Sequence, residues 1–453
     1  MIHHFFIKEY IASVANFSYS WQTRRVKKIL MSGGALLMGS AAVSKLLGLL
    51  RDRLLVSALP TEQLDQVFAA FRIPDFFFFL LVGGTVATLL LPRMANLKGL
   101  DRTRFLSSFL WIVVTVFGVF CLVGALFPGF FVQIFVSGFD GAARAEIATL
   151  VRWLFGSVWI LACSAVFGAA QQEQQKFFSV ALAPILYTGM ICLGIWFGLR
   201  DYGLTVIGVA AVCGAVLHLL SNLIAYLFSG GRLGWWWRKP VESFKNFGAD
   251  CSARVATNAA FQINLSADVW IASFLAAGAV SAYQIGTNLG MALLSMVGIP
   301  LASACFPKLT ATKGDKVEQK KVLKDALTWV FIATIPAAII GAVWAEFWLV
   351  FLFNAEGELL RLGTWIFQIV VISLPAACAI PVLSRVFLAN DDVKTPLRVT
   401  VIALSIATAI AALLALVILP KEIAVLGLGI GTFFANVLSA FLFWNAARNY
   451  FQQ

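Results

Sequence analysis

The chain has 453 residues, of which 60% are hydrophobic and only 12% are charged. Soluble globular proteins are typically about 45–50% apolar and about 25% charged. The composition therefore excludes an ordinary soluble protein and predicts an all-α polytopic membrane protein. The net charge of +12 does not indicate nucleic acid as a partner, because basic loops facing anionic lipid produce the same excess.

Cysteine and histidine give no sign of a metal centre. The 7 cysteines are scattered, mostly within apolar stretches, and no CxxC motif is present. The histidines, at positions 3, 4 and 218, are too dispersed to share a metal ion. We therefore expect no metal site and interpret the cysteines as small packing residues.

Residues 1–30 are interpreted as a cytoplasmic leader, either interfacial or disordered. Their basic residues follow the apolar stretches, which is the reverse of a secretory signal. After this leader, apolar runs of about 20 residues, enough to cross a bilayer, predict about twelve transmembrane helices. The N-lobe, residues 31–229, should hold spans near 31–57, 64–91, 105–136, 147–170, 177–199 and 203–229. The C-lobe, residues 251–453, should hold spans near 252–277, 282–306, 326–353, 362–389, 397–419 and 423–447.

Residues 230–250 separate the two lobes and combine three Trp with Arg and Lys. Trp favours the membrane interface and basic residues favour cytoplasmic headgroups, so this segment is predicted to be an amphipathic cytoplasmic linker. Lys and Arg are also far more frequent in the predicted cytoplasmic segments than in the external loops. Both termini are therefore expected to be cytoplasmic.

The two lobes show signs of a repeat. The second predicted span is followed by Pro92–Gly99 (PRMANLKG), and the eighth by Pro307–Gly314 (PKLTATKG). Because each lobe has an even number of spans, the lobes should share one orientation, as in transporters built from parallel repeats.

Several ionisable residues lie in the first two predicted spans. Placing such a residue at membrane depth costs about 2.5–3.5 kcal/mol, so these residues normally face a bundle interior or a wet cavity. On the first helix these are Lys45, Arg51 and Asp52, and on the second Asp65 and Arg72 share one face. We interpret Lys45, Arg51 and Arg72 as a cationic cavity for an anionic cargo, with Asp52 and Asp65 as orienting partners; Asp65 could pair with Arg72.

Two further features complete the candidate site. Pro74 should bend or break the second helix just after Arg72. Asp268 is a lone acid in the seventh predicted span. It could bind a coupling cation or a proton, or it could form a hydrogen bond that only supports helix packing.

The same residues carry a family resemblance. Ser44–Asp52 (SKLLGLLRD) resembles the first-helix pattern S-R-x-L-G-x-x-R-D of MurJ-type (MviN) lipid II flippases. Asp65–Pro74 resembles their D-A-F-x-x-A-F-[KR]-[LI]-P, and Asp392–Pro396 resembles their D-x-K-T-P. The likeness runs in one order over about residues 31–450. It implies the two six-helix lobes of the multidrug/oligosaccharidyl-lipid/polysaccharide exporter superfamily.

The resemblance also implies a task. The chain would move a lipid-linked peptidoglycan precursor, an undecaprenyl-pyrophosphate glycan, across a bacterial inner membrane by alternating access, for cell-wall synthesis. A pyrophosphate calls for Arg and Lys, and no catalytic group is needed in a transporter. The drive would be membrane potential or a cation (Na⁺ or H⁺), and the partners would be the glycan and membrane lipids. The sequence leaves the oligomeric state open.

Some positions depart from the family pattern. Phe78 stands where an Arg is usual, Gly83–Gly84 where E-G is usual, and Thr287–Asn288 where D-R is usual, while Lys45 replaces an Arg. Two further helices of typical members are not expected here. Two alternatives therefore stay open: an exporter of another polyprenyl-linked polysaccharide unit or a drug, and a non-transporting scaffold of the cell envelope.

Overall fold

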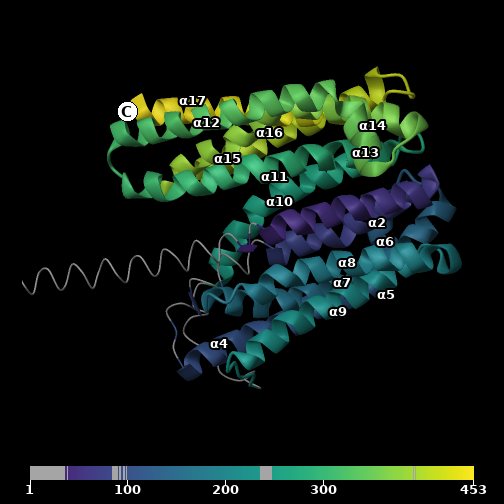
Figure 1. The fold of residues 1–453 in the computed structure, drawn as a ribbon, viewed down its shortest axis with the longest axis horizontal. Helices are drawn as coiled ribbons and strands as arrows, with labels where there is room; N and C mark the ends of the chain where they lie inside the picture. The colour runs from purple at the N-terminus through teal and green to yellow at the C-terminus, as the bar shows by residue number, and fades with distance from the viewer. Residues whose placement is uncertain are drawn as a thin grey trace, which may run out of the picture.

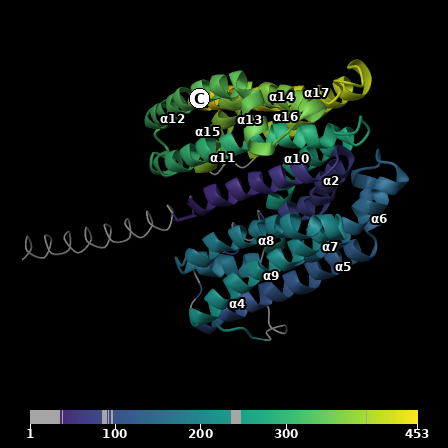
Figure 2. The same ribbon diagram turned by 45° about the vertical axis from the view of Figure 1, so that its right-hand side comes forward.

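The computed structural model of the chain describes residues 36–37, 39–83, 90, 93–94, 97, 99–234, 247–390, 392 and 394–452. The predicted leader and most of the predicted linker, from residue 235 to residue 246, lie outside these ranges. Within them the regular structure is helical and no strand occurs. The helices form two bundles, one from each half of the chain, which lie side by side in Figures 1 and 2.

The N-lobe begins with a helix over residues 39–58, called the first helix below. The elements that follow it are α2 (Thr61–Phe78), the π-helical turn η1 (Phe79–Gly83), α4 (Gly99–Ile112), the π-helical turn η3 (Val113–Phe117), α5 (Gly118–Leu126), α6 (Pro128–Phe135), α7 (Gly141–Glu173), α8 (Phe178–Tyr202) and α9 (Thr205–Phe228).

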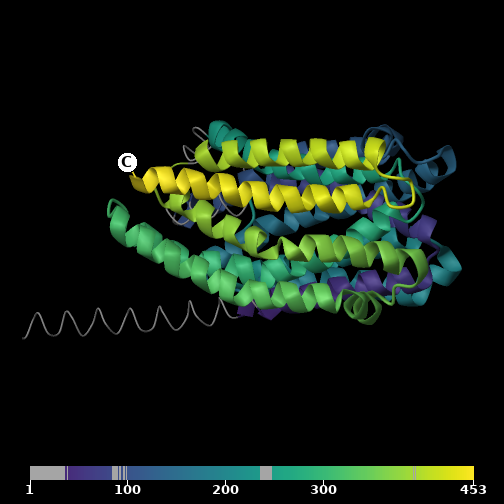
Figure 3. The ribbon, with the colours of Figure 1, turned by 90° about the horizontal axis from the view of Figure 1, so that it is seen from above.

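The C-lobe holds the remaining helices. They are α10 (Phe247–Ala272), α11 (Ala279–Ala311), α12 (Lys316–Val343), α13 (Ala345–Phe353), α14 (Gly357–Ile372), α15 (Leu374–Ala389), α16 (Lys394–Leu413), the π-helical turn η5 (Leu414–Ile418) and α17 (Leu426–Gln452). Seen from above, these helices run roughly along one direction (Figure 3).

The structure bears out an all-helical membrane protein, but not the full count of twelve spans. Among the described residues, 8 helices are long and apolar enough to cross a membrane, and the bent α14–α15 pair would make 9. The first helix, α2 and α10 are absent from this set. They carry the ionisable and polar side chains of the candidate site, such as Lys45, Arg72 and Asp268, which lower the apolar content of each helix.

Two predicted spans, 105–136 and 326–353, each hold a long and a short helix, and a third, 362–389, is divided at Ser373 with a bend of 44°. All three were wrong as single helices. In the N-lobe, Pro128 occupies the first turn of the separate short helix α6, and its missing N–H ends the preceding helix. In the C-lobe the interruption of 326–353 falls at Trp344, and the short helix α13 follows. The two breaks occupy corresponding places in the two halves, which supports the predicted parallel repeat.

Pro74 does not break the second helix. α2 continues from Pro74 to Phe78 and then passes into the π-helical turn η1. A wider π-turn can absorb a disturbed hydrogen-bond ladder without ending the helix. The Phe-rich segment therefore continues along the helix, where Phe77 packs against Phe131 and Phe155 in the N-lobe core.

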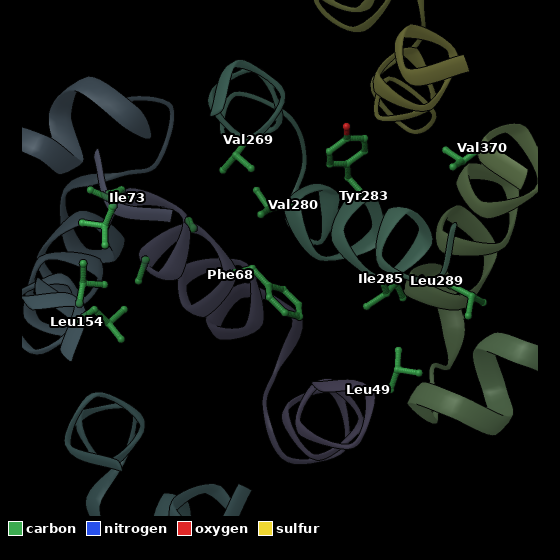
Figure 4. Packing of buried hydrophobic residues seen from close by; sticks show 14 of the residues in the cluster. Leu49, Phe68, Ile73, Leu154, Val269, Val280, Tyr283, Ile285, Leu289 and Val370 are labelled. Carbon is green, nitrogen blue, oxygen red and sulfur yellow. The ribbon is translucent and has the colours of Figure 1, made fainter. Parts of the chain in front are cut away.

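Close helix contacts depend on small residues, as is usual where lipid supplies no hydrophobic drive for association. α16 and α17 meet at Gly431, where an added Cβ would lie 2.5 Å from the Cβ of Ala411 and 3.1 Å from the carbonyl oxygen of Ala407. Between the lobes, α2 packs against α7 on one side and contacts α10 and α11 on the other. Figure 4 shows this junction, with Phe68 of α2 beside the apolar residues of α11.

Candidate substrate cavity and the closed end of the lobes

A cavity of about 290 Å³ lies where the two lobes meet. The N-lobe contributes Lys45 from the first helix and Arg72 from α2. The C-lobe contributes the rest of the wall, which is apolar except for the polar side chains of Asn264, Asp268, Tyr283, Gln284, Thr287, Asn288, Thr432 and Asn436. Two of the three predicted cationic residues therefore line one cavity.

Arg51, the third predicted cation, is held next to this cavity by Asp52. Its Nε and one terminal nitrogen donate to Oδ1 of Asp52 over 2.9 and 2.6 Å. Its guanidinium also lies 5.5 Å from the ring centre of Phe71, a cation–π distance. The second oxygen of the buried Asp52 accepts from Nδ2 of Asn288 on α11 over 3.0 Å. Asp52 therefore orients Arg51, and Asn288 joins this pair to the C-lobe.

Arg72 also crosses between the lobes. One terminal nitrogen donates to the side-chain oxygen of Gln262 over 2.8 Å and to its carbonyl oxygen over 3.1 Å. Its Nε donates to the hydroxyl of Ser266 over 3.2 Å. These partners on α10 are neutral, so they fix the guanidinium without cancelling its charge. Two carboxylates lie close enough to act electrostatically on Arg72: Asp75, one turn further along α2, and Asp268 on α10. Asp75 acts on Arg51 as well.

Asp65 does not pair with Arg72, contrary to the expectation from their shared face. Its buried carboxylate instead accepts from the backbone N–H groups of Gly278 and Ser281, each over 2.7 Å, and from the hydroxyl of Ser281. Gly278 immediately precedes α11 and Ser281 lies in its first turn, where backbone donors lack partners within their own helix. An N-lobe carboxylate thus caps a C-lobe helix.

The contact at Gly278 is also sterically tight. Gly278 has φ of +89°, a conformation that favours glycine, and an added Cβ would lie 2.7 Å from the methyl group of Thr61. The start of α2 is therefore pressed against the turn that begins α11. Below, we call the three hydrogen bonds of Asp65 the Asp65 latch.

Other contacts join the lobes at the same end, which is marked by α6 and α13 in Figure 1. The N–H of Gly138 and the hydroxyl of Ser273 lie 3.2 Å apart, and the indole N–H of Trp270 donates to Ser137 over 3.0 Å. Arg53 of the first helix donates to the carbonyl oxygen of Phe351 at the end of α13. Together with the Asp65 latch, these contacts close what we call the α6 end of the bundle.

Asp268 belongs to a polar network inside the C-lobe. The hydroxyl of Tyr283 donates to Oδ2 of Asp268 over 2.6 Å and lies 3.1 Å from the hydroxyl of Thr432 on α17. In Figure 4 this hydroxyl points away from α11, on the side opposite Leu49. Nearby, Nδ2 of Asn264 donates to the hydroxyl of Thr408 over 2.7 Å. The network therefore links α10, α11, α16 and α17.

The network offers oxygen atoms from one carboxylate and several neutral groups. Such oxygens are the donors that hard cations take in proteins, and a carboxylate can also take up a proton. No group of three or more His, Cys, Asp or Glu side chains able to hold a metal occurs among the described residues. Asp268 would be the charged ligand of such a cation.

Sequence reasoning missed the neutral half of the site. Gln262 and Ser266 lie four residues apart on α10, as do Asn264 and Asp268, and each pair faces its own set of partners. This spacing of polar residues within an apolar helix was a detectable signal. Tyr283 gave no such signal, because a single Tyr in a span is equally typical of the membrane interface.

The comparisons with known proteins agree with this architecture. A family model described as "Lipid II flippase MurJ" matches residues 61–452. A probable lipid II flippase MurJ of Thermotoga maritima is 24% identical over 367 residues, covering 79% of this chain and 74% of the relative. The corresponding protein of Rhizobium tropici is 26% identical over 420 residues, covering 88% and 77%.

The fold itself has solved counterparts. A lipid II flippase MurJ in an inward closed conformation matches with a TM-score of 0.78 at 19% identity, covering 91% of this chain and 87% of that one. An inward-facing multidrug transporter of the MATE family matches with a TM-score of 0.73 at 15% identity, covering 90% and 94%.

Proposed function

This chain belongs to the lipid II flippase MurJ family, and we propose that it moves a lipid-linked peptidoglycan precursor from the inner to the outer leaflet of a bacterial inner membrane. It is a multi-span helical transporter rather than an enzyme. The cargo class is a polyprenyl-pyrophosphate-linked glycan, and alternating access of the two lobes would carry its head group across the membrane.

The observation that carries the proposal is the excess of positive charge on the wall of the cavity between the lobes. Lys45 and Arg72 line it together with one acid, Asp268, and Arg51 lies beside it in a pair with Asp52. The hydrogen-bond partners of Arg72 are neutral, and Asp75 and Asp268 act on its guanidinium only through space. In a medium of low dielectric, a pyrophosphate gains more from such cations than it would in water. Lys45 would act as a point charge, and the other terminal nitrogen of Arg72, which Gln262 does not bind, would donate to phosphate oxygens.

The cavity is too small to hold the whole cargo, as expected for a closed state in alternating access. A volume of about 290 Å³ is at the low end for ligand pockets, which are typically about 300–1,000 Å³. It would hold a pyrophosphate but not a sugar–peptide head group as well. The lobes must therefore separate for the cargo to enter or leave, and the contacts at the α6 end are those that must break on that side.

The positive-inside distribution of Lys and Arg supports placing both termini in the cytoplasm. The α6 end would then face the outside, and the Asp65 latch would hold the external gate shut. A coupling cation at Asp268, either Na⁺ or H⁺, or the membrane potential acting on the cavity cations, would drive the return step.

A second candidate is transport of a different polyprenyl-linked glycan. Asn288 favours it, because a neutral amide stands in the cavity where the resembling family usually has an Arg, and the amide is already bound to Asp52. A cavity with one cation fewer would suit a head group that carries less negative charge. The pyrophosphate itself would be bound by the same Lys45 and Arg72.

Rescue of a depletion strain tests the proposal. Cells depleted of their own lipid II flippase would receive the wild-type chain, Arg72→Ala, Lys45→Ala or the control Arg361→Ala at matched membrane levels. Arg361 is an exposed arginine that pairs with Glu358 outside the cavity. We expect rescue by the wild type and the control but not by either cavity variant.

The other outcomes are equally informative. Rescue by both cavity variants would refute a role for the cavity cations. Failure of a well-expressed wild-type chain would refute lipid II as the cargo, and the second candidate would then be tested in strains that lack other glycan flippases.

A further inference from the structure

A second and larger groove opens between the first helix and α8 at the α6 end. Its volume is about 980 Å³, and it lies within the N-lobe, separate from the cavity between the lobes. Further from the α6 end the two helices are in contact, so they diverge toward the groove. Ser40 donates to the carbonyl oxygen of Ala181, and the thiol of Cys192 lies 3.7 Å from the carbonyl oxygen of Leu47.

The groove has one apolar and one polar side. Leu54, Ile195, Trp196 and Leu199 supply aliphatic and aromatic surface. Trp196 and Tyr202 stand at the edge of the groove with 70% and 73% of their surface exposed. Trp and Tyr in such positions are typical of the level of lipid headgroups, where a ring can contact acyl chains and polar groups together.

The polar side carries one charge of each sign. Glu146 comes from the first turns of α7, and Arg200 comes from the last turn of α8. Neither side chain makes an ion pair with another side chain in the part of the chain that the structure describes. Gln63 and Thr149 add neutral hydrogen-bonding groups to the lining. The groove thus offers one cationic and one anionic contact above an apolar wall.

We propose that this groove binds one zwitterionic phospholipid with an ethanolamine headgroup, from the leaflet at the α6 end. The guanidinium of Arg200 would bind the lipid phosphate, and the carboxylate of Glu146 would accept from the ammonium. One acyl chain would lie along Leu54, Ile195 and Leu199. The charge pattern disfavours a purely anionic lipid, because Glu146 would repel it, and it equally disfavours the pyrophosphate cargo.

A lipid bound in this groove would affect transport, because it would contact the first helix. Its inner wall is the last turn and a half of the first helix, and the same helix carries Lys45 and Arg51 at the cavity between the lobes. A lipid in the groove would hold the diverging end of this helix apart from α8. Any movement of the first helix during transport would then depend on the lipid at the α6 end.

Native mass spectrometry of the full-length protein in detergent tests the proposal. The protein would be titrated with phosphatidylethanolamine, phosphatidylcholine and phosphatidylglycerol of identical acyl chains, and with tail-free glycerophosphoethanolamine. We expect one ethanolamine lipid to bind about tenfold more tightly than either other lipid, the ratio expected from one charge-assisted hydrogen bond. The tail-free compound should not bind measurably.

Single-residue variants test which side chain binds the phosphate and which binds the ammonium of the headgroup. Arg200→Ala should weaken ethanolamine-lipid binding about tenfold, whereas Arg200→Lys should retain most of it. Glu146→Ala, which removes the acceptor, should abolish the preference for ethanolamine over choline. Arg361→Ala, which removes an exposed arginine from the same end of the molecule, should change nothing. Ala58→Trp should block the groove without changing its charge.

Three results would overturn the proposal. Tighter binding of phosphatidylglycerol than of the ethanolamine lipid would show a surface for anionic lipid. Unchanged binding in both Arg200→Ala and Ala58→Trp would place the lipid elsewhere. Equal losses in Arg200→Ala and in the control Arg361→Ala would indicate a general effect of surface charge. Thermal melting of each variant, compared with that of the wild type, separates these losses from misfolding.

Discussion

The Asp65 latch makes a quantitative prediction about the α6 end. Replacing Asp65 by Ala removes three acceptor contacts at once, two to backbone N–H groups and one to the hydroxyl of Ser281. Hydrogen bonds to a charged group contribute about 1.5–3 kcal/mol each when their donors stay buried. Opening the gate lets water reach the donors, so most of this energy is recovered in the open state.

We therefore expect a net loss of about 1.4 kcal/mol, close to the lower limit for one such bond, which raises the ratio of open to closed gates about tenfold. Ser281→Ala removes only the hydroxyl contact and should shift the ratio by a smaller factor. Glu62→Ala is the matched control, because Glu62 is an exposed acid one turn earlier on α2.

Spin-label distance measurements can read this ratio directly. Labels would be placed at Ala142 and Ala276, which lie on opposite lobes beside the closed gate, in a background without native cysteines. The short-distance population reports the closed gate and the long-distance population the open one. A shift of less than twofold in Asp65→Ala, or an equal shift in Glu62→Ala, would refute the idea that Asp65 holds this end closed.

Three further predictions concern other parts of the structure. Gly431→Ala should lower the melting temperature, because overpacking of this kind costs about 1–3 kcal/mol, whereas Gly189→Ala, where an added Cβ meets nothing within 4 Å, should not. Tyr283→Phe and Asp268→Asn should show a coupling of about 0.5–3 kcal/mol in a double-mutant cycle of unfolding; additive effects would contradict the hydrogen bond between them. Asn288→Ala should reduce the number of flippase-depleted cells that form colonies, because Asp52 loses its hydrogen bond to α11. The surface variant Thr328→Ala should rescue fully.

Several features of the site could be predicted from the sequence because charge in an apolar helix is a strong signal. Lys45, Arg72 and Asp268 each stood out in otherwise apolar spans, and all three line the cavity between the lobes. Their positions follow from the energetic need to keep ionisable groups away from lipid. The same charges keep these helices out of the set of apolar spans, because each charge lowers the apolar content of its helix.

The partners of these charges could not be predicted in the same way. Helix periodicity places Asp65 and Arg72 on one face, but it does not say which other helix each of them meets. Asp65 instead accepts from the N–H groups at the start of α11, which lie within hydrogen-bond distance, whereas Arg72 is two turns away along α2. The partner of Asp65 depends on how the two lobes pack, and the sequence of a single helix does not predict that packing.

The contrast between Asp65 and Asp52 shows how one residue type serves two tasks in this fold. Both are buried carboxylates in the N-lobe, and both accept from α11 in the C-lobe. Asp52 divides its oxygens between a cation of its own helix and the side chain of Asn288, so its contact with the other lobe is a single neutral bond. All three hydrogen bonds of Asp65 come from donors in the other lobe. Separating the lobes therefore costs more at Asp65 than at Asp52, and the gate at the α6 end can stay shut while the contacts around the cavity rearrange for cargo.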